Sequence, residues 1–321
     1  MANGTVALET AVAALGLEAG DEVIIPAFTI VSCALAVLYA GAVPVLVESD
    51  PVTWTLDPAA VEERIGPRTR AIMPVHIYGH PARMEPLLAV AARHGLAVVE
   101  DAAEAHGAEC LVDGRWRRCG SFGNASCFSF YANKLVTTGE GGMVVTDDAA
   151  LAERVRSLRN LSFEPGRRFY HRSLGHNYRL TNLQAALGVA QLGRMEEIVA
   201  RKRATAAAYT ARLAGLEQLE LPPEEPWARS VYWMYGVVLR DEAGPDAQEL
   251  AARLMDGGVE TRPFFLGMHE QPALLERGLF AGERYPVAER LARRGLYLPS
   301  GLALTEEQIE RVCSALREAL T

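Results

Sequence analysis

The sequence is poor in cysteine and contains no closely spaced cysteine pair. Its 321 residues include five cysteines, an odd number, and none of them forms a CxxC motif. A disulfide framework or a zinc site needs paired or clustered cysteines, so this pattern indicates free thiols in a reducing compartment. We therefore expect a cytoplasmic protein. The cysteines are Cys33, Cys110, Cys119, Cys127 and Cys313.

Excess positive charge is also missing. The formal net charge is -8 at pH 7, the isoelectric point is near 5.5, and lysine and arginine form no cluster. These values argue against nucleic acid or an anionic membrane as the main partner. Residues 23–47 carry no charge and are long enough to span a bilayer. Because Pro26, Gly41 and Pro44 divide this run into strand, helix and strand, we expect no membrane span. The first five residues lack the pattern of a secretory signal.

The common nucleotide and metal motifs are absent as well. No GxGxxG follows an expected strand and no GxxxxGK[ST] occurs, so dinucleotide and P-loop sites lack their markers. His76 and His80 have the spacing of two ligands on one helix face. Gly79 and Pro81 prevent that helix. We expect no metal site.

What the chain does contain is a regular alternation of helix and strand patterns. This alternation indicates an α/β fold with a mostly parallel sheet that is sandwiched by helices. Such sheets bind ligands beyond the carboxyl ends of their strands. The expected helices cover 5–15, 29–40, 57–65 and 81–94, and the expected strands cover 21–25, 44–47, 70–76 and 97–100.

The pattern changes after residue 146. We expect a helix over 148–159, a basic and aromatic loop over 161–174, and one long helix over 181–213. The proline-rich segment 222–226 marks a linker. Beyond it, the expected strands cover 233–240, 259–263 and 296–298, and the expected helices cover 247–255, 287–294 and 305–319. We predict a large cofactor-binding domain, 1–213, and a smaller α+β C-terminal domain, 214–321.

A lysine stands alone between two apolar segments that have the pattern of buried strands. The first segment is 127–131, the second is 143–146, and Lys134 lies in their connection. Burial favours the neutral form of an amine, and a neutral amine is a nucleophile toward carbonyl carbon. Three glycines within residues 139–142 permit close backbone approach to a ligand. A surface lysine on a hairpin is the alternative, since a motif is a hypothesis.

An aspartate marks the end of another expected core strand. Asp101 follows the apolar segment 96–99, where it can cap a helix, bind a metal or pair with a protonated heterocycle. Pyridoxal phosphate requires a lysine that forms a Schiff base and an aspartate that faces the pyridinium nitrogen. The pair of Lys134 and Asp101 therefore favours the third role. We predict that pyridoxal 5'-phosphate is the cofactor and that both residues are catalytic.

The phosphate of this cofactor needs donors at a helix N-terminus. Gly4 and Thr5 open the first expected helix and offer backbone N–H groups and a hydroxyl where the helix dipole favours an anion. Ser129 can supply another hydroxyl. Phe28 can stack on the ring, with ordinary core packing as the alternative. We expect His106 to line the ligand pocket.

Several motifs occur in an order that is specific to one family. They are 3–5 (Asn-Gly-Thr), 26–29 (Pro-Ala-Phe-Thr), 100–108 (Glu-Asp-Ala-Ala-Glu-Ala-His-Gly-Ala), 128–131 (Phe-Ser-Phe-Tyr), Lys134, 138–142 (Thr-Gly-Glu-Gly-Gly), 175–179 (Gly-His-Asn-Tyr-Arg) and 297–301 (Tyr-Leu-Pro-Ser-Gly). In these residues the chain resembles the DegT/StrS family of nucleotide-sugar aminotransferases. This resemblance implies the fold-type I architecture, with a sheet of the seven-stranded type.

The resemblance also implies roles for individual residues. Lys134 would form the Schiff base and act as general acid and base, and Asp101 would pair with the pyridine nitrogen. Glu104 would lie near the cofactor's hydroxyl, and Asn177 would reach the phosphate from the neighbouring subunit of a homodimer. The other implied roles are phosphate binding by Gly4, Thr5 and Ser129, ring stacking by Phe28, and substrate binding by His106, Tyr178 and Arg179.

Finally, the resemblance implies transamination in two half-reactions. L-glutamate would load its amine on the cofactor, and a nucleotide-linked 4-keto-6-deoxy sugar would receive it. Many members of the family have glutamine at the position of Glu104. The combination of Glu104 with His106 in this chain is similar to the pattern of GDP-perosamine synthases. The alternatives are a 3-keto-sugar or keto-cyclitol acceptor, or a non-catalytic cofactor-binding protein.

Two departures from the family pattern lead to further expectations. Members usually carry some tens of residues before the Asn-Gly-Thr segment, which here stands at the start. We therefore expect a chain that begins at an internal methionine or is a shortened version. A subgroup that dehydrates sugars has histidine in place of the lysine, and Lys134 argues against that activity.

Overall fold

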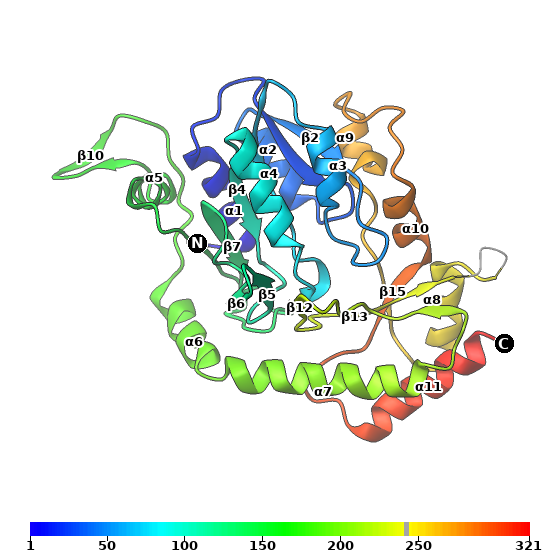
Figure 1. Ribbon diagram of the computed structural model, residues 1–321. Coiled ribbons are helices and arrows are strands. Elements are labelled where there is room, and N and C mark those ends of the chain that lie inside the picture. Colours follow the sequence, from blue (N-terminus) through cyan, green and yellow to red (C-terminus); the bar gives the residue numbers. More distant parts are fainter. Residues whose placement is uncertain (241–243) are drawn as a thin grey trace.

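A six-stranded sheet forms the centre of the first half of the chain (Figure 1). This computed structural model describes residues 1–240 and 244–321. Five neighbouring strands of the sheet run parallel, and the edge strand β8 is antiparallel to β7. The order across the sheet is β2 (Val43–Val47), β1 (Glu22–Pro26), β3 (Thr69–Ile72), β4 (Ala97–Asp101), β7 (Ala125–Ser129) and β8 (Gly142–Val145).

Helices cover both faces of this sheet, as the alternation predicted. In β1, Val23 and Ile25 pack into one hydrophobic cluster and Ile24 packs into another, because successive side chains of a strand point to opposite faces. The first cluster includes side chains of α1 (Gly4–Ala14), α2 (Ser32–Tyr39) and α5 (Ala149–Arg159), and the second includes side chains of α3 (Pro58–Glu63) and α4 (Met84–His94).

The mostly parallel α/β class is confirmed, but the described residues form six strands in this sheet where the seven-stranded type was expected. The two strands that lie between β4 and β7 in the sequence do not join this sheet. They pair antiparallel with each other, and one of them also pairs with a segment of the C-terminal half. They form a separate three-stranded sheet of β12 (Ala228–Arg229), β5 (Glu109–Val112) and β6 (Arg115–Arg118).

Two predictions for residues 161–213 were wrong. The expected loop contains a hairpin of β9 (Phe163–Glu164) and β10 (Arg167–His171). The expected single helix is divided into α6 (Asn182–Leu192) and α7 (Met195–Leu213), which Figure 1 shows as consecutive helices. Gly193 ends α6 and Arg194 has φ -110° and ψ 8°, outside the helical region. Glycine is a poor helix former, which accounts for the break at this position. The apolar pattern of the sequence continues through the break and therefore did not reveal it.

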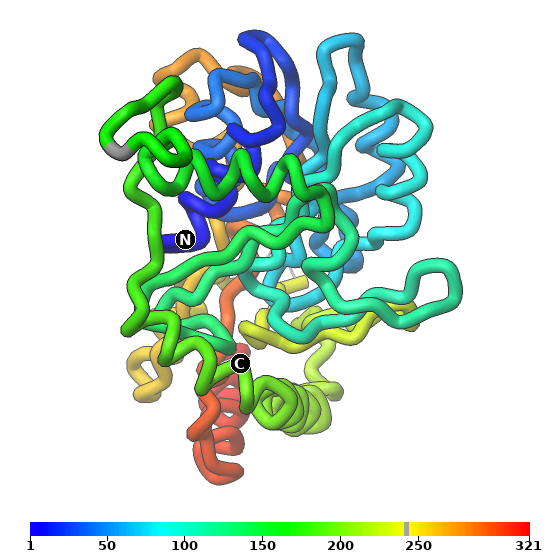
Figure 2. The backbone as a smooth tube through the Cα atoms, turned by 90° about the vertical axis from the view of Figure 1, so that its left-hand side faces the viewer, coloured from blue at the N-terminus to red at the C-terminus, as the bar shows by residue number. Residues whose placement is uncertain are grey.

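The C-terminal part has its own antiparallel sheet and hydrophobic cluster. Ala206, Tyr209 and Leu213 of α7 belong to that cluster, so the long helix packs on the C-terminal part. Figure 2 views α7 nearly end-on, close to the chain's C-terminal helix. The sheet order is β11 (Leu219–Glu220), β13 (Tyr235–Leu239), β15 (Gly295–Leu298) and β14 (Arg262–Pro263), and the helices are α8 (Ala247–Asp256), α9 (Pro272–Leu275), α10 (Pro286–Arg294) and α11 (Glu306–Ala319).

The expected division at residue 213 stays a prediction, although the expected elements of the C-terminal part are present with shifted ends. The strand expected over 259–263 is reduced to its last two residues. Among the described residues, no helix combines the length and the apolar character that crossing a membrane requires.

Candidate active site

A cavity of about 400 Å³ opens at the carboxyl edge of the parallel strands. Its walls come from the start of α1, the ends of β4 and β7, the connection to β8 and the C-terminal half. This is the edge at which open α/β sheets bind ligands. Six of the residues selected from the sequence line it: Gly4, Thr5, Asp101, Glu104, Ser129 and Lys134.

Lys134 lies inside this cavity. Its side chain is 11% exposed, and Nζ lies 3.4 Å from Oε1 of Glu104. The other oxygen of Glu104 accepts a hydrogen bond of 2.7 Å from the backbone N–H of Tyr78. Burial raises the pKa of the Glu104 carboxyl, and the charge of Lys134 acts in the opposite direction. The lysine is therefore a buried group, which excludes the alternative of a surface hairpin.

Asp101 is a buried carboxylate at the end of β4. It is 2% exposed, and its oxygens accept hydrogen bonds from the Ala103 N–H at 3.0 Å and the Cys33 thiol at 3.3 Å. Burial raises the pKa of Asp101, and these two donors oppose that rise. Within the described residues no cationic side chain forms an ion pair with it. A protonated ring nitrogen would supply the missing cation.

The start of α1 forms a cradle for an anion. Asn3 caps the helix, since its Oδ1 accepts the N–H of Val6 at 3.0 Å. In the described part of the chain, the first-turn N–H groups of Gly4 and Thr5 donate to no acceptor. A Cβ on Gly4 would lie 2.6 Å from Cβ of Ser129, so glycine is what lets helix and strand approach. Free N–H groups and the helix dipole both favour a phosphate here.

These groups fit pyridoxal phosphate. The cavity has an amine for a Schiff base, a buried carboxylate for a protonated nitrogen, and a helix N-terminus with hydroxyls for a phosphate. One hydroxyl that the sequence did not suggest belongs to Ser32, whose Oγ lies 2.8 Å from Oγ1 of Thr5. The predicted cofactor therefore agrees with the donor set.

Phe28 lies outside the cavity. Its ring is buried in an aromatic cluster, with centroids 6.0 Å from Tyr78 and 5.9 Å from Phe264. Core packing, the alternative weighed from the sequence, describes this position.

Ile30, two residues further on, lines the cavity and offers an apolar surface there.

His106 is likewise buried and is not a lining residue. Its ring packs between Phe128 and Phe130, at 5.4 and 5.6 Å between centroids. Neither ring nitrogen has a hydrogen-bond partner in the described chain. Burial, with a smaller effect of the Lys134 charge, lowers the pKa of His106 to about 3. The ring is therefore a neutral part of the wall behind the cavity.

The segment 177–179 does not reach the cavity of its own chain. Asn177 is exposed and its backbone pairs with Asn160. The hydroxyl of Tyr178 donates to Glu9 at 3.0 Å, and Nη1 of Arg179 donates to Oδ1 of Asn160 at 2.7 Å. The predicted roles of these three residues stay predictions.

Aromatic residues from the C-terminal half complete the site. Trp233, Phe265 and Tyr297 line the cavity, but they lie about a hundred residues or more beyond Lys134 in the sequence. The local sequence patterns around these three residues are typical of ordinary strands and loops. Only the long-range packing of the C-terminal part brings them to the site.

One buried cluster outside the cavity has metal-ligand types. Ligand atoms of His76, Glu100 and Cys119 lie within 4.8 Å of one another. The Glu100 carboxylate already accepts hydrogen bonds from His76, from backbone N–H groups of Gly120, Phe122 and Gly123, and from the Ser126 hydroxyl. The other nitrogen of His76 accepts the Ala82 N–H at 2.9 Å. These bonds make the cluster a hydrogen-bonded core network.

Comparisons with known proteins agree over nearly the whole chain. A sequence profile of the DegT/DnrJ/EryC1/StrS aminotransferase family matches residues 1–317. A GDP-perosamine synthase of Caulobacter vibrioides is 44% identical over 319 residues, which are 99% of this chain and 84% of the relative. A dTDP-3-amino-3,4,6-trideoxy-alpha-D-glucose transaminase of Streptomyces venezuelae is 42% identical over 323 residues, 98% of this chain and 81% of the relative. The X-ray structure of S. venezuelae DesV in complex with a ketimine intermediate has a TM-score of 0.89 and 41% identity, over 98% of this chain and 82% of DesV.

Proposed function

The chain belongs to the DegT/DnrJ/EryC1/StrS aminotransferase family, and we propose that it transfers an amino group from L-glutamate to a nucleotide-linked keto sugar. The observation that carries this proposal is the shared cavity of Lys134 and Asp101, which also contains the anion cradle of Gly4 and Thr5. An amine, a buried carboxylate and a helix N-terminus in one cavity are the three groups that pyridoxal phosphate uses.

When bound, the cofactor supplies an electron sink that stabilises negative charge on the substrate carbon. Asp101 keeps the ring nitrogen protonated, and Gly4, Thr5 and Ser129 hold the phosphate. Lys134 takes a proton at Nζ from one carbon centre and returns it to another. Glu104, with an oxygen 3.4 Å from that nitrogen, orients the amine.

We propose a nucleotide-linked 4-keto-6-deoxy sugar as the acceptor. The support is the Glu104 and His106 pattern together with the 44% identity to a GDP-perosamine synthase. The test loads the purified protein with pyridoxal phosphate, adds L-glutamate and then a 4-keto-6-deoxy nucleotide sugar, and follows absorbance and sugar products. We expect glutamate to change the cofactor spectrum, and the keto sugar to restore it with formation of an amino sugar.

A second acceptor class has support of its own. The 42% identical transaminase of Streptomyces venezuelae is named for a 3-amino sugar, so a 3-keto acceptor is the alternative. A panel of 3-keto and 4-keto nucleotide sugars and keto-cyclitols, assayed for restoration of the spectrum, separates these acceptors. A protein that only binds the cofactor would keep its spectrum unchanged when glutamate is added.

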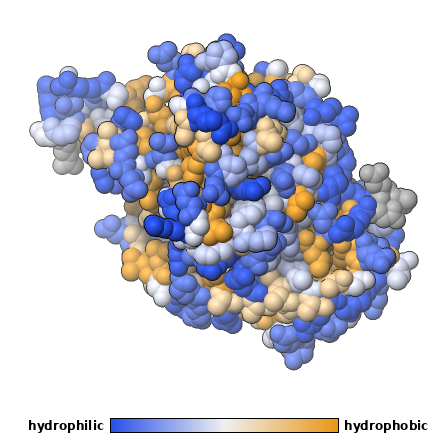
Figure 3. All heavy atoms as spheres, in the orientation of Figure 1, coloured by the Kyte–Doolittle hydropathy of each residue, from blue (hydrophilic) through white to orange (hydrophobic). Residues whose placement is uncertain are grey.

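We also propose a homodimer in which the two subunits share active sites. The helix α6 buries only Gly188 within its own chain, and Leu183, Leu187 and Val189 are 83%, 57% and 73% exposed. Apolar side chains over α6 form a patch at the lower left of Figure 3. Such a patch favours a protein partner. Asn177 would then reach the partner's phosphate site, with Tyr178 and Arg179 beside it.

The proposed location is the cytoplasm. All five cysteines are free and buried in the folded chain. Free thiols suit a reducing compartment.

A further inference from the structure

The indole ring of Trp233 covers the amine of Lys134. Nζ lies 3.7 Å from the ring centroid, on the face where a cation is attracted by the ring's electrons. The carboxylate of Glu104 contacts the same nitrogen at 3.4 Å. The amine therefore has a carboxylate and an aromatic face as neighbours, which restricts the directions in which its long side chain can point.

The same indole also holds the backbone beside the lysine. Its Nε1 donates a hydrogen bond of 2.8 Å to the carbonyl oxygen of Asn133. Trp233 thus makes two contacts on two consecutive residues, one on the backbone and one on the amine. A side chain with both contacts limits the motion of the loop and of the reactive group together.

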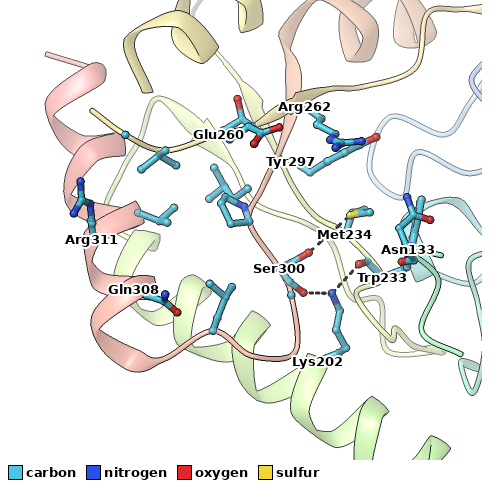
Figure 4. A pocket seen from close by; sticks show the side chains of 18 residues that line it. Asn133, Lys202, Trp233, Met234, Glu260, Arg262, Tyr297, Ser300, Gln308 and Arg311 are labelled. Carbon is cyan, nitrogen blue, oxygen red and sulfur yellow. Dashed lines mark hydrogen bonds between the residues drawn. The ribbon is translucent and has the colours of Figure 1, made fainter. Parts of the chain in front are cut away.

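Trp233 is itself held by a buried lysine. Nζ of Lys202, on α7, donates to the carbonyl oxygens of Trp233 at 2.8 Å and Ser300 at 2.5 Å. Figure 4 shows both bonds at the edge of a second cavity, of about 840 Å³, which shares Asn133, Trp233 and Tyr297 with the first. Lys202 has no carboxylate partner in the described chain, and burial lowers the pKa of its amine to about 7.

Gly79 packs closely against the backbone of Trp233. A Cβ on Gly79 would lie 2.7 Å from the backbone nitrogen of Trp233, and the φ of Gly79 is +95°. The backbone of Trp233 is therefore in contact with both Gly79 and Lys202. Burying an amine without a carboxylate partner costs stability, and both hydrogen bonds of Lys202 go to backbone carbonyls, so its contacts point to a positioning task.

We propose that Trp233 is a positioning residue for Lys134, and that Lys202 fixes Trp233 in the position in which its indole covers the amine. In this arrangement, contacts from α7 and from the segment after β15 determine the position of the Lys134 side chain. The idea rests on the proposed role of Lys134, but it concerns the placement of the amine, which can be measured without the cofactor.

The test uses the fact that the chain contains two lysines, Lys134 and Lys202. Cofactor-free protein is treated with a small amine-reactive reagent, and the labelling rate of Lys134 is followed by peptide mass spectrometry. The variants are Trp233→Leu, which removes the ring contact and the indole bond, Trp233→Phe, which removes the bond and keeps a ring, and Lys202→Met. Arg201→Met, which removes an exposed cation of α7 that pairs with Glu197, is the control.

We expect Trp233→Leu to raise the Lys134 labelling rate about tenfold, and Trp233→Phe and Lys202→Met to raise it several-fold, while Arg201→Met leaves it unchanged. The rate of pyridoxal phosphate capture, followed by absorbance, should fall in the same order. If Trp233→Leu does not fold, the Lys134 labelling rates of Trp233→Phe and Lys202→Met test the proposal. Folded variants that label at the wild-type rate overturn the proposal, even where Lys134 still binds the cofactor.

Discussion

At the scale of single residues, the site concentrates charge that the protein alone does not balance. Asp101 and Glu104 are buried carboxylates, and Lys134 is the cation that contacts Glu104. Burial raises the pKa of both carboxyls, which means that the folded chain alone disfavours their charged forms. A ligand that brings a protonated nitrogen to Asp101 removes this penalty, so the pocket is built for such a ligand.

This argument leads to a prediction for Asp101→Asn. An amide cannot keep the ring nitrogen protonated, so the cofactor should still bind while its electron sink is weakened. We expect the rate of the glutamate half-reaction to fall by about a hundredfold or more. Stopped-flow absorbance after glutamate addition measures this rate. Cys33→Ala, which removes one hydrogen-bond donor to the carboxylate and keeps its charge, is the control; a wild-type rate in Asp101→Asn would refute its role.

His106 leads to a prediction about acid stability. Burial lowers its pKa from the ordinary 6.5 to about 3. Between these values the unfolded chain takes up a proton that the folded chain does not, so stability falls as the pH falls through this window. The effect of the one histidine is about 1.4 kcal/mol per pH unit. Above pH 6.5 both states are neutral and the effect disappears.

The measurement is urea unfolding at several pH values between 7 and 5, for the wild type and for His106→Phe. We expect the variant, whose ring suits the contacts with Phe128 and Phe130, to lose less stability on acidification. His94→Gln removes a partly exposed histidine and serves as the control. Parallel pH dependences for the wild type and His106→Phe would show that the buried ring does not remain neutral.

Individual site residues differed in how well the sequence predicted them. Clear strand or helix patterns lie next to three of the predicted residues, at places where a residue of their type has few structural uses. These residues are Lys134, Asp101 and Gly4, and all three line the cavity. Phe28 and Ile30 are both apolar and lie two residues apart, so composition could not tell which one faces the ligand. The backbone direction after β1 decides this, and it depends on tertiary packing.

At the scale of elements, the start of α1 is the part that the site depends on most. The helix is packed against β7 so closely that a side chain on Gly4 would collide with Ser129. This close approach places the first-turn N–H groups and the Ser129 hydroxyl at one end of the cavity. Element positions in the first half were predictable because strand and helix periods differ clearly. The break at Gly193 was not, because apolar residues continue through it.

We predict that Gly4→Ala weakens cofactor binding. The added Cβ would lie 2.6 Å from Cβ of Ser129, so the helix start or the strand must shift. We expect the dissociation constant of pyridoxal phosphate to rise about tenfold or more, which corresponds to about 1.4 kcal/mol. Fluorescence or absorbance titration measures it.

The control for this prediction is Ala13→Gly, at an exposed position near the other end of α1. It destabilises the helix by about 0.5–1 kcal/mol without touching the cavity. If both variants weakened binding equally, the loss would reflect helix stability, and the cradle at Gly4 would have no special role.

At the scale of the whole molecule, α6 is the helix that leaves several apolar side chains exposed. Leu183, Leu187 and Val189 face solvent, while the cavity is completed by residues from both halves of the chain. The family resemblance implies a shared site. No local pattern could show which surface is shared, because the exposure of α6 follows from the packing of its neighbours.

We predict that Leu183→Glu combined with Val189→Glu converts a dimer into monomers. Burying two carboxylates in an apolar interface is strongly unfavourable. Analytical ultracentrifugation at micromolar concentration measures the mass, and Met255→Glu, on the exposed side of α8, is the control. Cofactor affinity should fall with the dimer if Asn177 of one subunit contacts the other's phosphate. A wild-type sedimentation profile would place the interface elsewhere.

The most direct measurement concerns which amine binds the cofactor. Purified protein is loaded with pyridoxal phosphate, reduced with borohydride, digested and mapped by mass spectrometry. Since Lys134 and Lys202 are the chain's two lysines, the tagged peptide identifies the amine without ambiguity. We expect the tag on Lys134 and its complete loss in Lys134→Ala, with the fold retained. A tag on Lys202, or no tagged peptide, would contradict the assignment of the active site.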